Sequence, residues 1–315
     1  MSTTAIEPNI VFMGSPEFAV PSMRALAAGP YMLTVVTQPD RPAGRGGKPA
    51  PPPVKQAALE LGIPILQPET VRDPDFRARL AALHPKATVL VAYGEYLPVS
   101  LLDLPERGSI NLHPSLLPRW RGSTPVQSAI LAGDRTTGVT VIRMDKGLDT
   151  GPIIAQQVVE IGPDETQPEL SHRLARVGAD LLAQILPLWL RGEIEAVPQD
   201  DAQSTLTRTL TKEDGLLDWT LSAEELALRV RALQPWPGTY TYWQGNPLKI
   251  IRARPLQLDI TPMPGKVSIA NKGLHVQTGK GTLEILTLQP AGRATMEARA
   301  FLAGYPSIGG SVLGR

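Results

Sequence analysis

The chain has 315 residues, enough for two domains, and its 42% hydrophobic and 19% charged residues are typical of a soluble globular protein. The sequence contains no cysteine, which excludes disulfides, thiolate nucleophiles and cysteine-based zinc sites. The formal net charge of +1 is unevenly spread, because residues 229–315 contain eleven Lys and Arg against three Asp and Glu, a net of +8 that leaves −7 for the rest. A basic module joined to an acidic one is typical of a protein that meets a polyanion, although a well-solvated surface would give the same pattern.

Residues 1–9 lack the basic region and apolar core of a signal peptide. The longest apolar stretches are interrupted by charges or prolines before they could span a membrane. We therefore expect a cytoplasmic protein with no membrane partner.

Strands alternate with helices through the first half of the chain. Short apolar strands are predicted at 9–13, 32–37, 63–66, 87–92 and 109–112, with helical stretches such as 54–61 and 74–83 between them. This alternation predicts an α/β fold with a doubly wound, mostly parallel, Rossmann-like sheet, in which ligands bind outside the carboxyl ends of the strands. Residues 137–144 and 153–160 read as an antiparallel extension of that sheet, and 164–190 as a long helix.

The second half begins after residues 191–208, which show no periodicity and are interpreted as a linker. A helix is predicted at 223–233, and short strands broken by Gly and Pro at 248–252, 265–270, 273–278 and 281–288. That spacing predicts a small, OB-like β-barrel. The expected domains are therefore 1–200, which holds the candidate catalytic residues described below, and 208–315.

One histidine stands apart from the other three. His84, His172 and His275 are most simply structural or surface residues, whereas His113 directly follows an apolar strand, where an α/β sheet presents side chains to a ligand. Asn111 lies two residues earlier and so shares a face of the extended chain with His113. An amide that donates to a carbonyl oxygen gaining charge, beside a histidine that exchanges protons near neutrality, suits attack on an acyl carbon.

A carboxylate is the expected third member of this set. Asp149 lies in a Gly-flanked turn between two predicted strands, with Asp145 and Asp134 as weaker rivals. An ordinary turn aspartate is the simpler interpretation on turn statistics alone, and the functional one is a carboxylate that orients His113. Metal-ligand spacing, a G-x-S-x-G elbow and a G-x-G-x-x-G fingerprint are all absent from the sequence.

Residues 38–55 form a basic segment rich in Pro and Gly, a composition that argues against helix or strand. It is either a flexible surface loop or an arm that contacts phosphates and becomes ordered on binding. Its candidate phosphate contacts are Arg41, Arg45 and Lys48, and those of the basic C-terminal module are Lys249, Arg252 and Arg254.

Taken together, these segments resemble the methionyl-tRNA formyltransferase family. The resemblance rests on residues 111–122 (NLHPSLLPRWRG), 145–151 (DKGLDTG), 37–46 (TQPDRPAGRG), 234–237 (QPWP) and 288–292 (LQPAG), and it covers nearly the whole chain. The Asn-x-His…Asp core is shared by other enzymes that take formyl from 10-formyltetrahydrofolate, whereas the basic loop and the C-terminal barrel favour tRNA. Two departures are Pro114, where many members have glycine, and Glu95, in a segment that is usually apolar.

The resemblance implies transfer of formyl from 10-formyltetrahydrofolate to the α-amino group of initiator methionyl-tRNA, with folate as cosubstrate and no metal. It implies catalytic roles for Asn111, His113 and Asp149. The implied folate contacts are Val91, Ala92, Tyr93, Gly94, Glu95, Tyr96, Leu97, Ser115, Leu116, Leu117 and Pro118. Two alternatives stay open: a formyltransferase or formyl hydrolase that acts on a small metabolite with the same core, and a non-catalytic RNA-binding protein.

Overall fold

The computed structural model describes residues 7–43, 48–258 and 263–314, and these form two compact units. The first unit comprises Met1–Pro125, Thr136–Glu160 and Ser171–Thr207, and the second comprises Val126–Arg135, Ile161–Leu170 and Arg208–Arg315. None of the described helices is long and apolar enough to cross a membrane.

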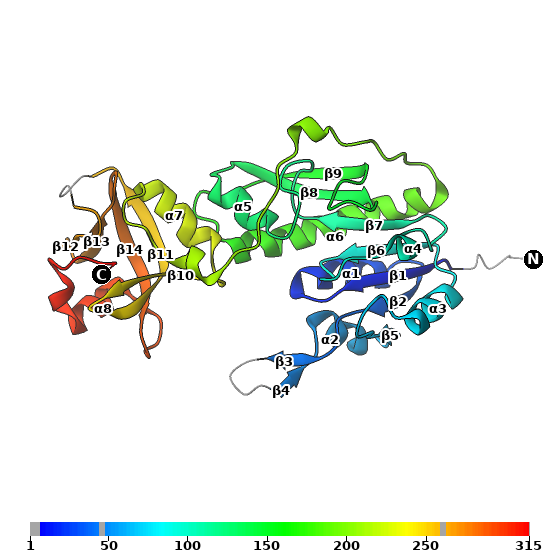
Figure 1. The fold of residues 1–315 in the computed structure, drawn as a ribbon, viewed down its shortest axis with the longest axis horizontal. Coiled ribbons are helices and arrows are strands. Elements are labelled where there is room, and N and C mark those ends of the chain that lie inside the picture. The colour runs from blue at the N-terminus through cyan, green and yellow to red at the C-terminus, as the bar shows by residue number, and fades with distance from the viewer. Residues whose placement is uncertain (1–6, 44–47, 259–262, 315) are drawn as a thin grey trace, which may run out of the picture. The chain divides into compact units, whose positions relative to one another are not determined.

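A seven-stranded sheet with the order β5-β2-β1-β6-β7-β8-β9 forms the centre of the first unit (Figure 1). Its strands are β1 (Asn9–Gly14), β2 (Met32–Val36), β5 (Ile65–Leu66), β6 (Ala87–Val91), β7 (Ser109–His113), β8 (Thr136–Arg143) and β9 (Ile153–Glu160). The helices of this unit are η1 (Glu17–Ala19), α1 (Val20–Ala27), α2 (Pro53–Glu60), α3 (Pro74–Ala82), α4 (Val99–Leu102) and α6 (Gln167–Arg191), whose residues 167–170 are assigned to the second unit. Apart from Pro125, α5 (Pro125–Leu131) also belongs to the second unit.

The sheet has the predicted mixed topology. β5, β2, β1, β6 and β7 pair in parallel, and β8 and β9 extend the sheet in antiparallel fashion. Every residue of β6 is buried, as expected for a continuous apolar strand covered on both faces. The chain winds from β1 outward to β2 on one side and then to β6 and β7 on the other, which places a topological switch point beside β1.

A glycine sets the approach of α6 to the sheet. A Cβ atom added at Gly178 would lie 2.5 Å from the Leu112 side chain, so only glycine lets α6 lie this close to β7. The apolar residue between Asn111 and His113 is thereby anchored in the core, and its two polar neighbours point to the opposite face of the strand.

The basic segment 38–55 contains strand after all, contrary to the prediction. β3 (Arg41–Ala43) and β4 (Lys48–Ala50) form a short antiparallel hairpin in which Pro42 pairs with Pro49. Proline removes one backbone donor, but a two-stranded ribbon has free edges on both sides and needs few ladder bonds. Residues 44–47, which include Arg45, lie outside the described residues.

The second unit contains an antiparallel sheet with the order β10-β11-β14-β13-β12, and β15 pairs with β14. Its strands are β10 (Thr239–Trp243), β11 (Asn246–Leu256), β12 (Val267–Ala270), β13 (Gly273–Gln277), β14 (Thr282–Pro290) and β15 (Met296–Glu297), and its own helices are α7 (Ala223–Ala232) and α8 (Ala298–Gly304). One face is covered by α7 and α8, whose Leu226, Val230 and Phe301 join a single apolar core with residues of the sheet.

This sheet does not close into the predicted barrel. Among the described strands, β10 and β12 are the two ends of the order and do not pair with each other. Both outer edges are occupied by other segments instead: the Leu217 N–H donates to Tyr240 O at 2.9 Å beside β10, and the Val267 N–H donates to Ser311 O at 2.9 Å beside β12. With their edge groups satisfied in this way, the end strands have no need to pair with one another.

Candidate functional site

The site is built on the carboxyl end of β7. Parallel pairing with β6 sets Leu90 beside Asn111, and antiparallel pairing with β8 sets Thr140 beside His113. Asn111 and His113 project from the same face of the strand. The Asn111 side chain has no hydrogen-bond partner among the described residues, so its amide can donate to an incoming oxygen.

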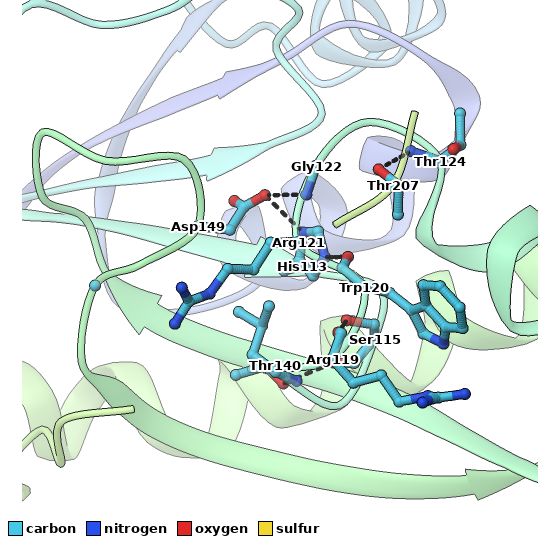
Figure 2. Close-up of polar contacts among 12 residues, drawn as sticks. His113, Ser115, Arg119, Trp120, Arg121, Gly122, Thr124, Thr140, Asp149 and Thr207 are labelled. Atoms are coloured by element: carbon cyan, nitrogen blue, oxygen red, sulfur yellow. Dashed lines mark hydrogen bonds and ion pairs between the residues drawn. The ribbon is translucent and has the colours of Figure 1, made fainter. Parts of the chain in front are cut away.

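His113 is held from two sides, by Trp120 and by Asp149 (Figure 2). Only 4% of the residue is exposed. Its Nε2 lies 2.9 Å from Trp120 O, and because a carbonyl only accepts, that nitrogen carries a hydrogen. Its Nδ1 faces Asp149 Oδ2 at 3.5 Å. The structure therefore brings Asp149 to His113, with the second ring nitrogen directed at the carboxylate.

The Asp149 carboxylate is itself fixed by backbone. Its Oδ2 accepts the Gly122 N–H at 2.9 Å, and its side chain is 14% exposed. Asp149 has a positive φ of 53°, which is uncommon for a residue with a side chain. The turn is tight, since a Cβ on Gly151 would lie 1.8 Å from Arg143 O. This backbone directs the carboxylate toward the end of β7.

The rival aspartate of this turn has a different role. Asp145 Oδ1 accepts the Gly147 N–H at 2.9 Å and the Thr150 hydroxyl at 2.7 Å. Both bonds lie within the turn, so Asp145 stabilises its shape while Asp149 faces the histidine.

Thr140 organises the segment that follows β7, and no sequence pattern pointed to it. Its hydroxyl donates to Ser115 O at 2.6 Å and accepts the Leu117 N–H at 3.1 Å and the Gln156 amide at 2.8 Å. Ser115 is fully buried and donates to Arg119 O at 2.6 Å, so its hydroxyl is already used within the protein. Of the predicted contacts in 115–118, the partly exposed Leu116 and Pro118 remain the accessible side chains.

The predicted contacts in 91–97 divide into buried residues, the half-buried Glu95 and exposed residues. Tyr93 and Leu97 lie in the apolar core beside β6, where burial, together with the nearby Glu95 charge, raises the pKa of Tyr93. The Glu95 carboxylate accepts the Thr70 hydroxyl at 2.7 Å and the Val71 N–H at 3.2 Å. Its charge is thus used to hold a neighbouring loop. The exposed members of the segment are Ala92, Gly94 and Tyr96.

The predicted phosphate contacts lie on strands in separate units. Arg41 is exposed on β3, and Lys48 begins β4, where its side chain lies outside the described residues. Lys249, Arg252 and Arg254 are all exposed on β11. A bulge in the β11–β14 pairing around Arg252 restores the alternation, so all three cations project from the same face.

The residues interpreted as a linker, 191–208, belong to the first unit except for Arg208. Residues 197 and 206 form bridges to Ile153 and Arg121, and the Thr205 hydroxyl accepts the Trp120 N–H at 2.9 Å. This segment therefore supports the loop that contacts His113. No periodic pattern marks it, because isolated bridges leave no hydrophobic repeat in the sequence.

Comparison with known proteins places these features in a family. Residues 9–186 match the formyl transferase family, and residues 209–306 match the C-terminal domain of formyl transferases. The methionyl-tRNA formyltransferase of Chloroflexus aurantiacus is 50% identical over 299 residues, which cover 94% of this chain and 96% of that protein. The methionyl-tRNA formyltransferase of Methylococcus capsulatus is 46% identical over 302 residues, which cover 96% and 98%.

The fold also resembles that of a solved sugar formyltransferase. The structure of WlaRD, a sugar 3N-formyl transferase, in the presence of dTDP and 5-N-formyl-THF has a TM-score of 0.68 with this chain. The match covers 92% of this chain and 100% of that one at 16% identity, which shows a shared fold.

Proposed function

This chain belongs to the formyl transferase family, among its methionyl-tRNA formyltransferases, and we propose that it formylates the α-amino group of initiator methionyl-tRNA for translation initiation. The observation that carries the proposal is the set at the end of β7, where Asp149 faces His113 and Asn111 projects beside them. An acyl transfer needs a donor to the carbonyl oxygen and a group that moves a proton, and this set provides both.

A folate is the proposed source of the formyl group, and a sugar formyltransferase with the same fold, solved in the presence of 5-N-formyl-THF, supports this proposal. We expect 10-formyltetrahydrofolate as the donor, since the family resemblance implies it. The exposed residues of 91–97 and the Leu116 and Pro118 side chains flank the end of β7, so they are the surfaces on which it would rest.

Asn111 is the proposed donor to the formyl oxygen. In the transfer, a C–N bond forms to the methionine amine while the C–N bond to the folate nitrogen breaks, and negative charge develops on the formyl oxygen. The unpartnered Asn111 amide can hydrogen-bond to that charge without first giving up a bond to another described residue. Removing a donor of this kind costs roughly 3–4 kcal/mol of transition-state stabilisation.

His113 and Asp149 are the proposed proton-handling pair. The attacking amine must lose a proton, and the departing folate nitrogen must gain one. With Nε2 bonded to Trp120 O, the ring takes up a proton at Nδ1, where the Asp149 carboxylate stabilises the positive charge. The Gly122 N–H keeps that carboxylate in place while the ring changes charge.

The cationic face of β11 is the proposed site for tRNA phosphates, together with Arg41 on β3. Arg254 donates to Glu284 at 2.5 Å, and the Arg252 charge lies near enough to Glu169 to help lower the pKa of that carboxyl, whereas Lys249 forms no ion pair with any residue that the structure describes. Both arginines thus have a carboxylate nearby, with that of Arg254 in direct contact, so we expect Lys249 to contribute most and Arg254 least to the affinity for phosphate.

One assay tests the proposal directly. The protein should transfer formyl from 10-formyltetrahydrofolate to charged initiator tRNA, but not to uncharged or elongator tRNA. Formylation of a small amine with no transfer to tRNA would instead support the small-metabolite alternative, which the near full-length relatives do not favour.

A further inference from the structure

Gln199 connects the Asp149 turn to the loop that follows β7. Its Nε2 donates to Asp149 O at 2.8 Å and to Gly151 O at 2.7 Å. Its Oε1 accepts from Arg121 Nη2 at 2.8 Å and from Arg121 Nε at 3.2 Å. All these residues lie within the first unit, and Gln199 falls between the two segments that match the family.

The orientation of this amide is unambiguous. Two backbone carbonyls accept only, and a guanidinium donates only, so the nitrogen must face the turn and the oxygen must face Arg121. Reversing the amide would break all four bonds. Gln199 is therefore specified by its surroundings at both ends of the side-chain amide.

Arg121 is a rigid support for that amide. It is 5% exposed, and its guanidinium also donates to Asp201 at 2.6 Å. Its backbone N–H donates to Thr205 O at 2.9 Å, and its carbonyl accepts the Thr207 N–H at 2.8 Å. The position of Gln199 is thus tied to the loop that also contains Trp120 and Gly122, which contact His113 and Asp149.

The Asp149 turn needs such a restraint. Glycines at 147 and 151 make the backbone permissive, and Asp149 itself has the unfavourable φ of 53°. Two hydrogen bonds to the carbonyls of residues 149 and 151 fix the peptide planes on the C-terminal side of Asp149. Without them, the turn can relax and the carboxylate can leave His113.

We propose that Gln199 is a positioning residue that holds the Asp149 carboxylate against His113 by binding the two carbonyls of its turn. The expected effect of Gln199 on kcat rests on the proposed function, whereas its effect on the position of the Asp149 carboxylate does not. It gives the segment after α6 a role in the chemistry, although the Gln199 side chain bonds to neither the His113 ring nor the Asp149 carboxylate.

Two variants and a matched control test the kinetic part. Gln199→Ala removes the side chain, while Gln199→Glu keeps an acceptor for Arg121 and removes both donors to the turn. Both should lower kcat about 10- to 100-fold, the loss expected for a misplaced catalytic group, with KM for folate and tRNA within about 2-fold. Gln203→Ala is the control, because Gln203 is exposed and, among the described residues, its side chain bonds to Asp200 alone. It should retain wild-type kcat.

A double variant separates positioning from general stability. In an Asp149→Asn background, Gln199→Ala should lower kcat by less than about 2-fold further, since residues that act as a unit are not additive. An equal loss in both backgrounds would show that Gln199 does not act through Asp149 and would overturn the proposal. Full activity of Gln199→Glu would overturn it equally.

Amide hydrogen exchange, which does not depend on enzyme activity, separates this proposal from the proposed function. The Gly122 N–H is protected by Asp149 Oδ2, so its hydrogen exchange should accelerate in Gln199→Ala but not in Gln203→Ala. Unchanged exchange at Gly122 refutes the positioning role even if the protein proves to formylate another acceptor. Accelerated exchange in a protein with no tRNA activity would support positioning and reject only the proposed function.

Discussion

Replacing Asp149 with asparagine is the sharpest test of the catalytic pair, because it removes charge and little else. The asparagine side chain can keep an oxygen near the Gly122 N–H, which Asp149 Oδ2 now accepts at 2.9 Å. It cannot place a negative charge 3.5 Å from His113 Nδ1. The change therefore leaves the turn intact and destabilises the ring when it is positively charged.

We expect Asp149→Asn to lower kcat at least ~100-fold, which is the low end for a group engaged in general acid–base catalysis. A hundredfold loss corresponds to about 2.7 kcal/mol at about 1.36 kcal/mol for each factor of ten. KM for the folate and for charged tRNA should change little, because the Asp149 side chain is 14% exposed and faces His113. His113→Ala should give a loss at least as large.

The measurement is steady-state formylation of initiator methionyl-tRNA, with Asp145→Asn as the control. Asp145 lies in the same turn, and its Oδ1 accepts from Gly147 and Thr150. Asparagine can retain that oxygen, so this variant should keep kcat within about 3-fold. If Asp149→Asn turned over at near the wild-type rate, or both variants were impaired equally, the assignment of Asp149 as the partner of His113 would be wrong.

Three further outcomes are expected. A fragment of residues 1–207 should bind folate and unfold at a higher temperature than a fragment of residues 1–200. Only the longer fragment keeps Thr205, whose hydroxyl accepts the Trp120 N–H at 2.9 Å. Equal melting temperatures of the two fragments would contradict this role of Thr205. Replacing Lys249 and Arg252 with alanine should reduce the slope of log affinity for tRNA against log salt by about 0.7–0.9 for each phosphate that the variant no longer binds, and a parallel slope would reject this face as the tRNA site. The Arg208 guanidinium holds the pKa of Asp214 below its ordinary value of 3.8. The ionised Asp214 therefore stabilises the folded protein above pH 3.8, and this stabilisation is lost as the pH falls below 3.8. Asp214→Asn should lower the urea midpoint of unfolding at neutral pH, and the difference in midpoint between variant and wild type should narrow below pH 3.8.

The local sequence pattern determined the layers and the strand ends. Apolar runs separated by helical stretches predicted the parallel sheet and its antiparallel extension, and both are present. The position of Asn111 and His113 at the end of β7 followed from the same pattern, since a strand has a two-residue period and its end is marked by Pro114. These features depend on neighbours in sequence, so the sequence reveals them.

Only the tertiary structure decided which residues that are distant in sequence contact one another. Only the folded chain brings Asp149 to His113 and gives Asp145 a role within the turn. The 191–208 segment lacked periodicity, yet its Gln199 and Thr205 hold the loops on either side of the site. Hydrogen bonds between distant segments depend on the geometry of both partners, and a single polar residue in a loop carries no mark of the carbonyl that it will bind.

The same reason explains the two errors of fold. A Pro- and Gly-rich composition argued against strands in 38–55, but the register of β3 with β4 pairs Pro42 with Pro49 and so places both prolines where few ladder bonds are forfeited. Strand spacing predicted a barrel, but whether a sheet closes depends on which segments reach its edges. Here the segments at Leu217 and Ser311 occupy those edges, and the strands between them remain an open sheet.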